Sequence, residues 1–178
     1  MAYSQYISIQ SRRSQPMATP EDRDWWGDAS TSFGIGITVG SFWAVWKWAE
    51  NIMVGSNQCF DIRWAEAVAV ELALHVAINK EVLSSRHYLV QSDNTRVVSV
   101  LNKGRSRSHE TNQVLKNIYT SLAKHNLRIL AVYVPSCNNV TDALSRGDIK
   151  DFLQGFPKAQ FKALVPLPAH LFNFLISL

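Results

Sequence analysis

Four acidic residues stand where a folded chain can gather them into one site: Asp28, Glu66, Asp93 and Asp142. Clustered carboxylates repel one another unless cations neutralise them, so a converging set implies a hard metal ion such as Mg²⁺ or Mn²⁺. Two such ions about 3.5–4 Å apart can bind both the attacking water and the leaving oxygen of a phosphodiester during in-line hydrolysis. The acids therefore indicate metal-dependent chemistry on a phosphodiester.

Asp28 and Glu66 fall on elements that the apolar pattern of the first half predicts. Aromatic and β-branched residues favour three short antiparallel strands, over 25–30, 33–39 and 42–48. Residues 61–83 lack Pro and Gly and are rich in Ala, Leu and Val. They predict a helix that is apolar around most of its circumference and is therefore buried against the sheet.

The second half alternates strands and helices and places Asp93 at the end of a strand. The predicted elements are a strand over 87–92, a helix over 95–101, a helix over 110–125, a strand over 127–134 and a helix over 138–146 that carries Asp142. Ligand sites of open α/β sheets form beyond the carboxyl ends of parallel strands, which is where Asp93 projects. The four acids are therefore expected to meet at one edge of the sheet.

Four motifs in this order resemble the ribonuclease H domain of retrotransposon reverse transcriptases, of gypsy type or DIRS type. They are Asp28-Ala29-Ser30 followed by a Gly-x-Gly strand, Glu66-Ala67-Val68-Ala69-Val70, Ser92-Asp93-Asn94, and Asn139-Val140-Thr141-Asp142-Ala143-Leu144-Ser145-Arg146. The last motif is the most specific, and the set covers about two-thirds of the chain. The resemblance implies an α/β, ribonuclease H-like fold, in which a mixed five-stranded sheet is flanked by helices.

The same resemblance implies a function. It assigns catalysis and the binding of two Mg²⁺ or Mn²⁺ ions to Asp28, Glu66, Asp93 and Asp142. The implied reaction is cleavage of the RNA strand of an RNA/DNA hybrid, by a domain that is part of or derived from a retroelement reverse transcriptase. A polymerase domain of the parent polyprotein is then the expected partner. One departure is that residues 135–139 lack the His that many family members carry before the last Asp.

Glu71 competes with Glu66 for the place in the site. Five helical residues turn by about 500°, which leaves the two side chains about 140° apart, so only one can face the site. Glu66 is preferred because it fits the spacing of the family motif, and because Ala69 and Ala73 then let the helix approach the sheet closely. Glu71 is expected to face another partner or solvent.

Contacts to nucleic acid are predicted for a basic loop and for three polar side chains. Lys103, Arg105 and Arg107 on the loop over 103–108 can bind phosphates without reading sequence, although the loop can equally be a solvated surface loop. Asn94 either bonds a sugar or base edge or caps the following helix. Ser30 and Asn112 are weaker candidates for backbone contacts. The six tryptophans can stack on bases but are expected in the core instead.

Composition limits the remaining possibilities. With 178 residues, 47% hydrophobic and 18% charged, the chain fits one globular domain and no disordered or fibrous class. The predicted divisions are a flexible lead-in over 1–22, a ribonuclease H-like domain over 23–148 and an appended tail over 149–178. The tail either packs on the domain or is an exposed apolar end, left where a longer polyprotein is divided. The net charge of +4 mildly favours a polyanionic partner.

Compartment and membrane association follow from other features of the sequence. Cys59 and Cys137 have no metal spacing and are expected to be free thiols of a reducing compartment. The sequence shows neither a signal peptide nor a membrane span, so the protein is expected to be intracellular, in cytoplasm or nucleus.

Two other functions compete with the hydrolase. One is a non-catalytic nucleic-acid-binding or scaffold module that keeps a relic of the fold. The other is a nuclease or strand-transfer enzyme of the same superfamily that acts on DNA. The complete set of four acids favours the hydrolase over the binding module.

Overall fold

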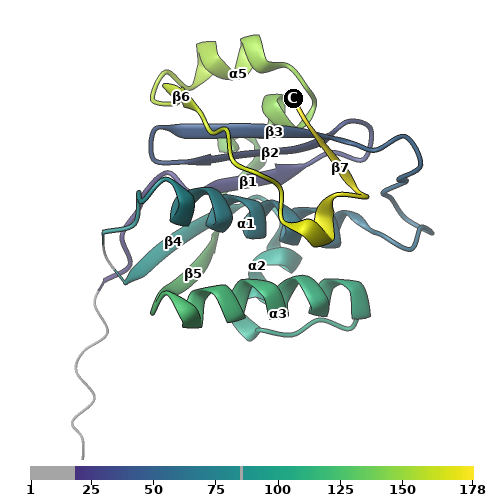
Figure 1. The fold of residues 1–178 in the computed structure, drawn as a ribbon, viewed down its shortest axis with the longest axis horizontal. Coiled ribbons are helices and arrows are strands. Elements are labelled where there is room, and N and C mark those ends of the chain that lie inside the picture. Colours follow the sequence, from purple (N-terminus) through teal and green to yellow (C-terminus); the bar gives the residue numbers. More distant parts are fainter. Residues whose placement is uncertain (1–18, 85) are drawn as a thin grey trace, which may run out of the picture.

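The centre of the molecule is a mixed sheet. The structure, a computed structural model, describes residues 19–84 and 86–178, so most of the predicted lead-in lies outside the described residues. The central strands are β1 (Trp26–Ala29), β2 (Gly34–Val39), β3 (Phe42–Trp48), β4 (His87–Ser92) and β5 (Arg128–Tyr133). They lie in the order β5-β4-β1-β2-β3 (Figure 1).

Strand directions confirm the predicted fold class. β2 runs antiparallel to both β1 and β3, whereas β4 is parallel to β1 and β5 is parallel to β4. Helices flank this sheet, as predicted for the α/β class (Figure 1). Because β1 and β4 are parallel neighbours, the chain just beyond β4 lies next to the middle of β1, which places Asp93 beside Asp28.

Helix α1 (Ile62–Asn79) is the central helix and is buried along most of its length. The Asp61 side chain caps it by accepting a hydrogen bond from the backbone of Trp64. A Cβ atom at Gly27 would lie 3.0 Å from the Cβ of Ala69, so glycine on β1 and alanine on α1 let the two elements approach closely. This close packing brings the first half of α1 to Asp28.

Two further helices complete the region beside β4 and β5. Helix α2 (Thr95–Lys103) follows Asp93, and helix α3 (His109–Lys124) packs beside α1 through Val114, Leu115, Ile118 and Leu122 (Figure 1). Asn102 of α2 bonds the outer side of β5 twice. Its side chain donates to the carbonyl of Ala131 over 2.8 Å and accepts from the same residue's N–H over 2.9 Å.

The predicted helix over 138–146 is wrong in its first half. Residues Ser136–Asn138 form the short 3₁₀ helix η1, and α4 covers only Asp142–Ser145. Asn139 has an extended backbone, and its side-chain oxygen accepts from both the N–H and the hydroxyl of Thr141. This local bonding competes with a continuous helix. α4 packs on β2, where a Cβ at Gly36 would lie 2.8 Å from Leu144.

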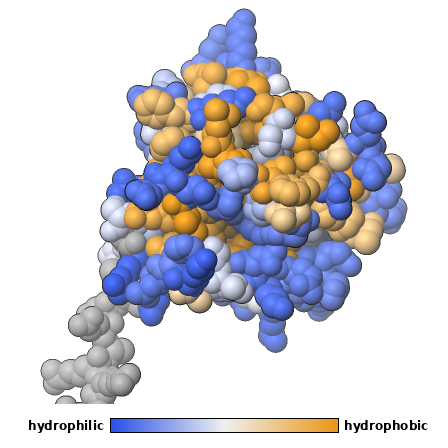
Figure 2. Space-filling model, viewed as in Figure 1, coloured by the Kyte–Doolittle hydropathy of each residue, from blue (hydrophilic) through white to orange (hydrophobic). Residues whose placement is uncertain are grey.

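Residues 149–178 pack on the domain, the first of the two arrangements that the sequence leaves open. They form α5 (Ile149–Gly155), β6 (Phe161–Lys162), the short 3₁₀ helix η2 (Ala169–Leu171) and β7 (Leu175–Ser177). β6 pairs with β3 in parallel and β7 pairs with β3 antiparallel, so the sheet has seven strands instead of the predicted five. Between them the chain crosses α1 (yellow in Figure 1), and the face that it crosses shows apolar surface between polar patches (Figure 2).

The core contains every tryptophan, as predicted. Trp25, Trp26, Trp43, Trp46, Trp48 and Trp64 are each at most 7% exposed, which leaves none of them free to stack on a base. Both cysteines are free thiols, also as predicted. Within the described residues, no helix combines the length and apolarity that crossing a membrane requires.

Candidate active site

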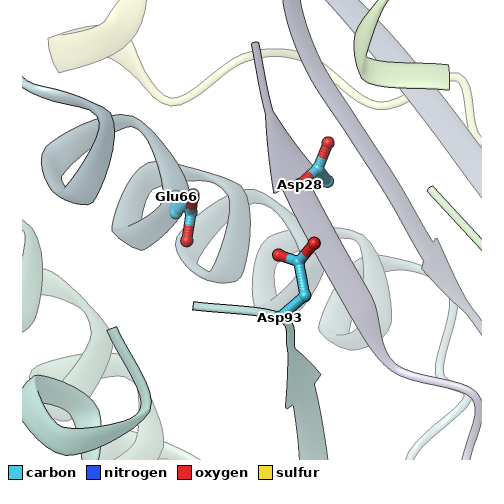
Figure 3. Close-up of side chains that lie close together, drawn as sticks. All are labelled: Asp28, Glu66 and Asp93. Carbon is cyan, nitrogen blue, oxygen red and sulfur yellow. The ribbon is translucent and has the colours of Figure 1, made fainter. Parts of the chain in front are cut away.

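Three of the four predicted acids come together where β1, α1 and the end of β4 meet (Figure 3). Asp28, Glu66 and Asp93 each offer one carboxylate oxygen, and these atoms all lie within 4.8 Å of one another. Asp28 stands on β1, Glu66 on the first half of α1, and Asp93 directly follows β4. The parallel pairing of β1 with β4 and the close contact between Gly27 and Ala69 account for this convergence.

Asp28 is buried and held by two side chains from the region around α4. Asn139 donates to its Oδ1 over 3.0 Å, and the Ser145 hydroxyl donates to its Oδ2. Burial raises the pKa of Asp28 to about 6, and the charges of Asp93 and Asp142 add to that rise. The two hydrogen bonds act in the opposite direction. These bonds fix the orientation of the Asp28 carboxylate, although its burial still makes the ionised form costly in free energy.

Glu66 is also buried and has one partner of its own. Asn94 donates to its Oε1 over 3.2 Å, whereas its Oε2 is buried without a hydrogen-bond partner among the described residues. Burial raises the pKa of Glu66 to about 8, and Asp28 and Asp93 reinforce the shift. An unpartnered carboxylate oxygen in a buried place costs free energy unless a proton or a cation satisfies it.

The chemistry of this donor set fits a divalent ion. Three carboxylates share a small, partly buried space and repel one another, and one buried oxygen lacks a partner. Carboxylate oxygens are the ligands that Mg²⁺ and Mn²⁺ prefer. The residues present therefore match the metal that the sequence predicts.

Asp142 lies outside the group of three. Its carboxylate binds the guanidinium of Arg146, one helical turn further on, with contacts of 2.9 and 3.0 Å. It is still close enough for its charge to raise the pKa of Asp28. The structure thus places Asp142 at the rim of the site in an exposed ion pair, and its role as a metal ligand stays a prediction.

Glu71, the competitor of Glu66, faces elsewhere on α1. Its Oε1 lies 2.8 Å from Nε2 of His170, in the segment that crosses the helix. Burial raises the pKa of Glu71 to about 7. It is absent from the group of three acids, in line with the angular argument from the helix.

Sequence reasoning missed the two groups that hold Asp28. Asn139 and Ser145 both belong to the motif that ends in Arg146, in which the sequence predicts a site role only for Asp142. They stand three residues before and three residues after Asp142. That symmetry was the available signal, because both side chains can donate to a carboxylate.

The three cations predicted on the basic loop line a hollow together with Arg63 and Arg96. Lys103 lies on the last turn of α2 rather than on the loop, which begins at Gly104. The hollow has a volume of about 730 Å³. Its lining residues are Arg63, Thr95, Arg96, Ser99, Val100, Lys103, Arg105, Ser106 and Arg107. Arg63 lies on the first turn of α1 and Arg96 on the first turn of α2, so the hollow borders the helix that carries Glu66 and the helix that begins shortly after Asp93.

The other predicted nucleic-acid contacts are used within the protein. Asn94 caps α2 by accepting from the backbone of Arg96, in addition to its bond to Glu66. The Ser30 hydroxyl donates to the carbonyl of Ser145 over 2.7 Å. Asn112 bonds both the N–H and the carbonyl of Ser106, and thereby fixes the basic loop.

Comparisons with known proteins give similarity to two solved structures. No protein-family model matches the chain, and no curated protein matches it significantly. The chain is similar to the N-terminal ribonuclease H domain of Rv2228c from Mycobacterium tuberculosis, with 16% identity and a TM-score of 0.47 over 75% of this chain and 95% of that chain. It is also similar to RNase H1 from Halobacterium salinarum, with 15% identity and a TM-score of 0.48 over 74% of this chain and 99% of that chain.

Proposed function

We propose that the chain is a metal-dependent endonuclease of the ribonuclease H type, which cleaves the RNA strand of an RNA/DNA hybrid. The observation that carries this proposal is the convergence of Asp28, Glu66 and Asp93 on one partly buried point beside a basic hollow. Carboxylates gathered in this way suit divalent metal ions, and cations around a hollow suit the phosphates of a nucleic acid.

The carboxylates act as ligands whose positions are fixed before substrate arrives. Asn139 and Ser145 orient Asp28, and Asn94 orients Glu66. Divalent ions bound there supply Lewis-acid activation of the attacking water and stabilisation of the leaving oxygen. Carboxylates that are already hydrogen-bonded to other side chains lose little conformational entropy when a metal ion binds.

Asp142 is the proposed fourth ligand. Its ion pair with Arg146 is exposed, and exposed pairs contribute little to stability. Exchanging that pair for a ligand interaction therefore costs little free energy. Asp142 stands close enough to Asp28 to influence its charge state, which supports a place at the same site.

Lys103, Arg105 and Arg107 are proposed to bind phosphates of the hybrid. They share the hollow with Arg63 and Arg96, so five cations face one volume. Contacts of this kind position a duplex without reading its sequence. Ser30, Asn94 and Asn112 are already bonded within the protein, and we propose that they support the site from there.

The motif over residues 139–146 supports an origin in a retroelement reverse transcriptase. We therefore propose a polymerase domain as partner and an intracellular setting, in which hybrids arise during reverse transcription. Within this motif, Asn139 and Ser145 bond the carboxylate of Asp28, and Leu144 packs on β2.

Cleavage of a labelled RNA/DNA hybrid with Mg²⁺ or Mn²⁺ tests the proposal. We expect the wild type to cut only the RNA strand and Asp93→Asn to lose at least about 100-fold in rate, since a ligand carboxylate is removed. Asp151→Asn, which changes an exposed acid on α5, is the matched control and should keep full activity.

The same assay separates the competing functions. Cutting of a DNA duplex instead of the hybrid would assign the chain to the DNA-directed nucleases of the superfamily. Hybrid binding that weakens with salt, without any cleavage, would assign it to the binding modules. Undiminished cleavage by Asp93→Asn would exclude the proposed site.

A further inference from the structure

The last 16 residues run along α1 like a strap. We call residues 163–178 the strap; it crosses the helix from its carboxyl end towards its amino end (Figure 1). Successive contacts join Leu164 to Lys80, Pro166 to His75, His170 to Glu71 and Phe174 to Trp64. The strap then ends in β7, which pairs with β3. It therefore ties α1 to the sheet edge on which β7 lies.

The final contact of the strap is an aromatic one. The ring of Phe174 lies 5.2 Å from that of Phe60 and 5.5 Å from that of Trp64, between ring centroids. Its backbone carbonyl accepts from the N–H of Ala49 over 2.9 Å. Trp64 in turn contacts Phe60 at 4.5 Å and stacks on Trp48 at 5.9 Å. Phe174 thus closes a cluster of four aromatic side chains.

This cluster is connected to the candidate site through neighbouring residues of α1 and through hydrogen bonds. Trp64 stands two residues before Glu66, on the first turn of α1. Trp48 donates from its indole N–H to the carbonyl of Ser30 over 2.8 Å. Ser30 bonds the backbone of Ser145, whose hydroxyl holds Asp28. The ring that the strap inserts therefore contacts the first turn of α1 directly, just before Glu66. It is linked to the Asp28 side chain only indirectly, through Trp64, Trp48 and the serines.

Support matters at this place because the first turn of a helix lacks half of its backbone bonds. The Asp61 side chain caps it, the N–H of Ala65 bonds the Asp61 carbonyl over 3.1 Å, and Ile62 and Trp64 pack on the core. Mutual repulsion between the acids also favours moving Glu66 away, since carboxylates close together resist joint ionisation. A fixed first turn holds Glu66 at the distance that a shared ion requires.

We propose that the strap is a positioning element of the metal site and that Phe174 holds the first turn of α1, so that Glu66 stays within reach of Asp28 and Asp93. This inference rests on the proposed function, because it takes the three carboxylates to be metal ligands. It makes the last residues of the chain part of the working site, although they lie outside the segment that carries the acids.

Calorimetric titration of Mn²⁺ into the full chain tests the inference, with circular dichroism as a check of folding. We expect Phe174→Ala to raise the dissociation constant about 10-fold or more, the size typical for loss of a residue that orients a ligand. Phe174→Leu keeps apolar volume and should fall between wild type and the alanine variant. Phe172→Ala is the matched control, because Phe172 lies on the same segment and is 60% exposed.

Kinetics on the hybrid give a second readout. A positioning role predicts a lower kcat at limiting metal with little change in KM for the hybrid, since the lining of the basic hollow comes, apart from Arg63, from α2 and the loop that follows it rather than from α1. A folded Phe174→Ala with wild-type Mn²⁺ affinity, or equal weakening by Phe172→Ala, would overturn the inference. Should the alanine variant not fold, Phe174→Leu decides alone: weaker Mn²⁺ binding supports the inference and unchanged binding overturns it.

Failure of the inference is distinct from failure of the proposed function. A wild type that neither binds Mn²⁺ nor cleaves the hybrid would remove the metal site itself, and the strap's proposed role with it. A different outcome is a wild type that binds Mn²⁺ and cleaves the hybrid, together with a Phe174→Ala variant of unchanged Mn²⁺ affinity. That outcome would support the proposed nuclease function and reduce the strap to a segment that only stabilises the fold.

Discussion

Burial moves the pKa of Glu66 further from its ordinary range than that of Asp28, to about 8 against about 6. A raised pKa means that folding favours the neutral acid. Without metal, the stability that this group contributes is fully present below the ordinary carboxyl pKa of about 4.3. It is lost as the pH rises through about 8. The cluster is therefore costly in the form that binds metal.

Glu66→Gln tests this linkage. The variant cannot ionise, so in the presence of a chelator we expect it to be more stable than the wild type at pH 9 by a few kcal/mol, with the difference vanishing near pH 4. Thermal unfolding across this range measures it. Glu50→Gln, at an exposed position, should show no such trend. A difference that does not change with pH would contradict the account.

The Ser145 hydroxyl is the group whose loss should alter the pH dependence of cleavage. Because its bond to Asp28 lowers the pKa of that acid, Ser145→Ala raises it above about 6. We expect activity to fall about 10-fold near pH 6 and less near pH 8, where Asp28 is ionised in either case. A pH–rate profile measures this, with the exposed Ser136→Ala as control. Equal losses at both pH values would argue for a general structural defect.

At the scale of elements, α1 could be predicted closely because its signal is local. A run rich in Ala and Leu without Gly or Pro favours a helix through local propensity, and the structure differs by one residue at the amino end and by four at the carboxyl end. The helix over 138–146 could not be predicted correctly, because the side chain of Asn139 determines where the helix begins. Side-chain bonds to neighbouring backbone compete with the helix at a level that composition does not reveal.

The basic loop offers a prediction at this scale. Arg105→Ala combined with Arg107→Ala should weaken hybrid binding and lower the slope of log affinity against log salt by about one for each phosphate that the variant no longer binds. Binding measured at several salt concentrations gives this slope. Lys124→Ala with Lys150→Ala removes the same charge from exposed positions outside the hollow, and should leave the slope nearly unchanged. Equal effects of the two pairs would mean that only net charge matters.

At the scale of the whole molecule, the limits of prediction are set by distance along the chain. The acids could be named from the sequence because the motifs mark them individually. The five cations of the hollow could not be grouped, since Arg63 and Arg96 reach it from other elements. The strap shows no period of its own, and its partners lie far earlier in the chain, about 100 residues on α1 and about 130 on β3. Its course depends on tertiary packing alone.

The bond between Asn102 and Ala131 has a consequence for how the protein behaves in a crowded solution. A peptide group on the outer side of β5 is occupied by a side-chain amide, which imitates the next strand. The opposite side of the sheet is occupied by β6 and β7. Open strand edges are templates on which other chains add and aggregate. With a side-chain amide on one edge and the chain's own β6 and β7 on the other, we expect this sheet to add further strands less readily than a sheet with open edges.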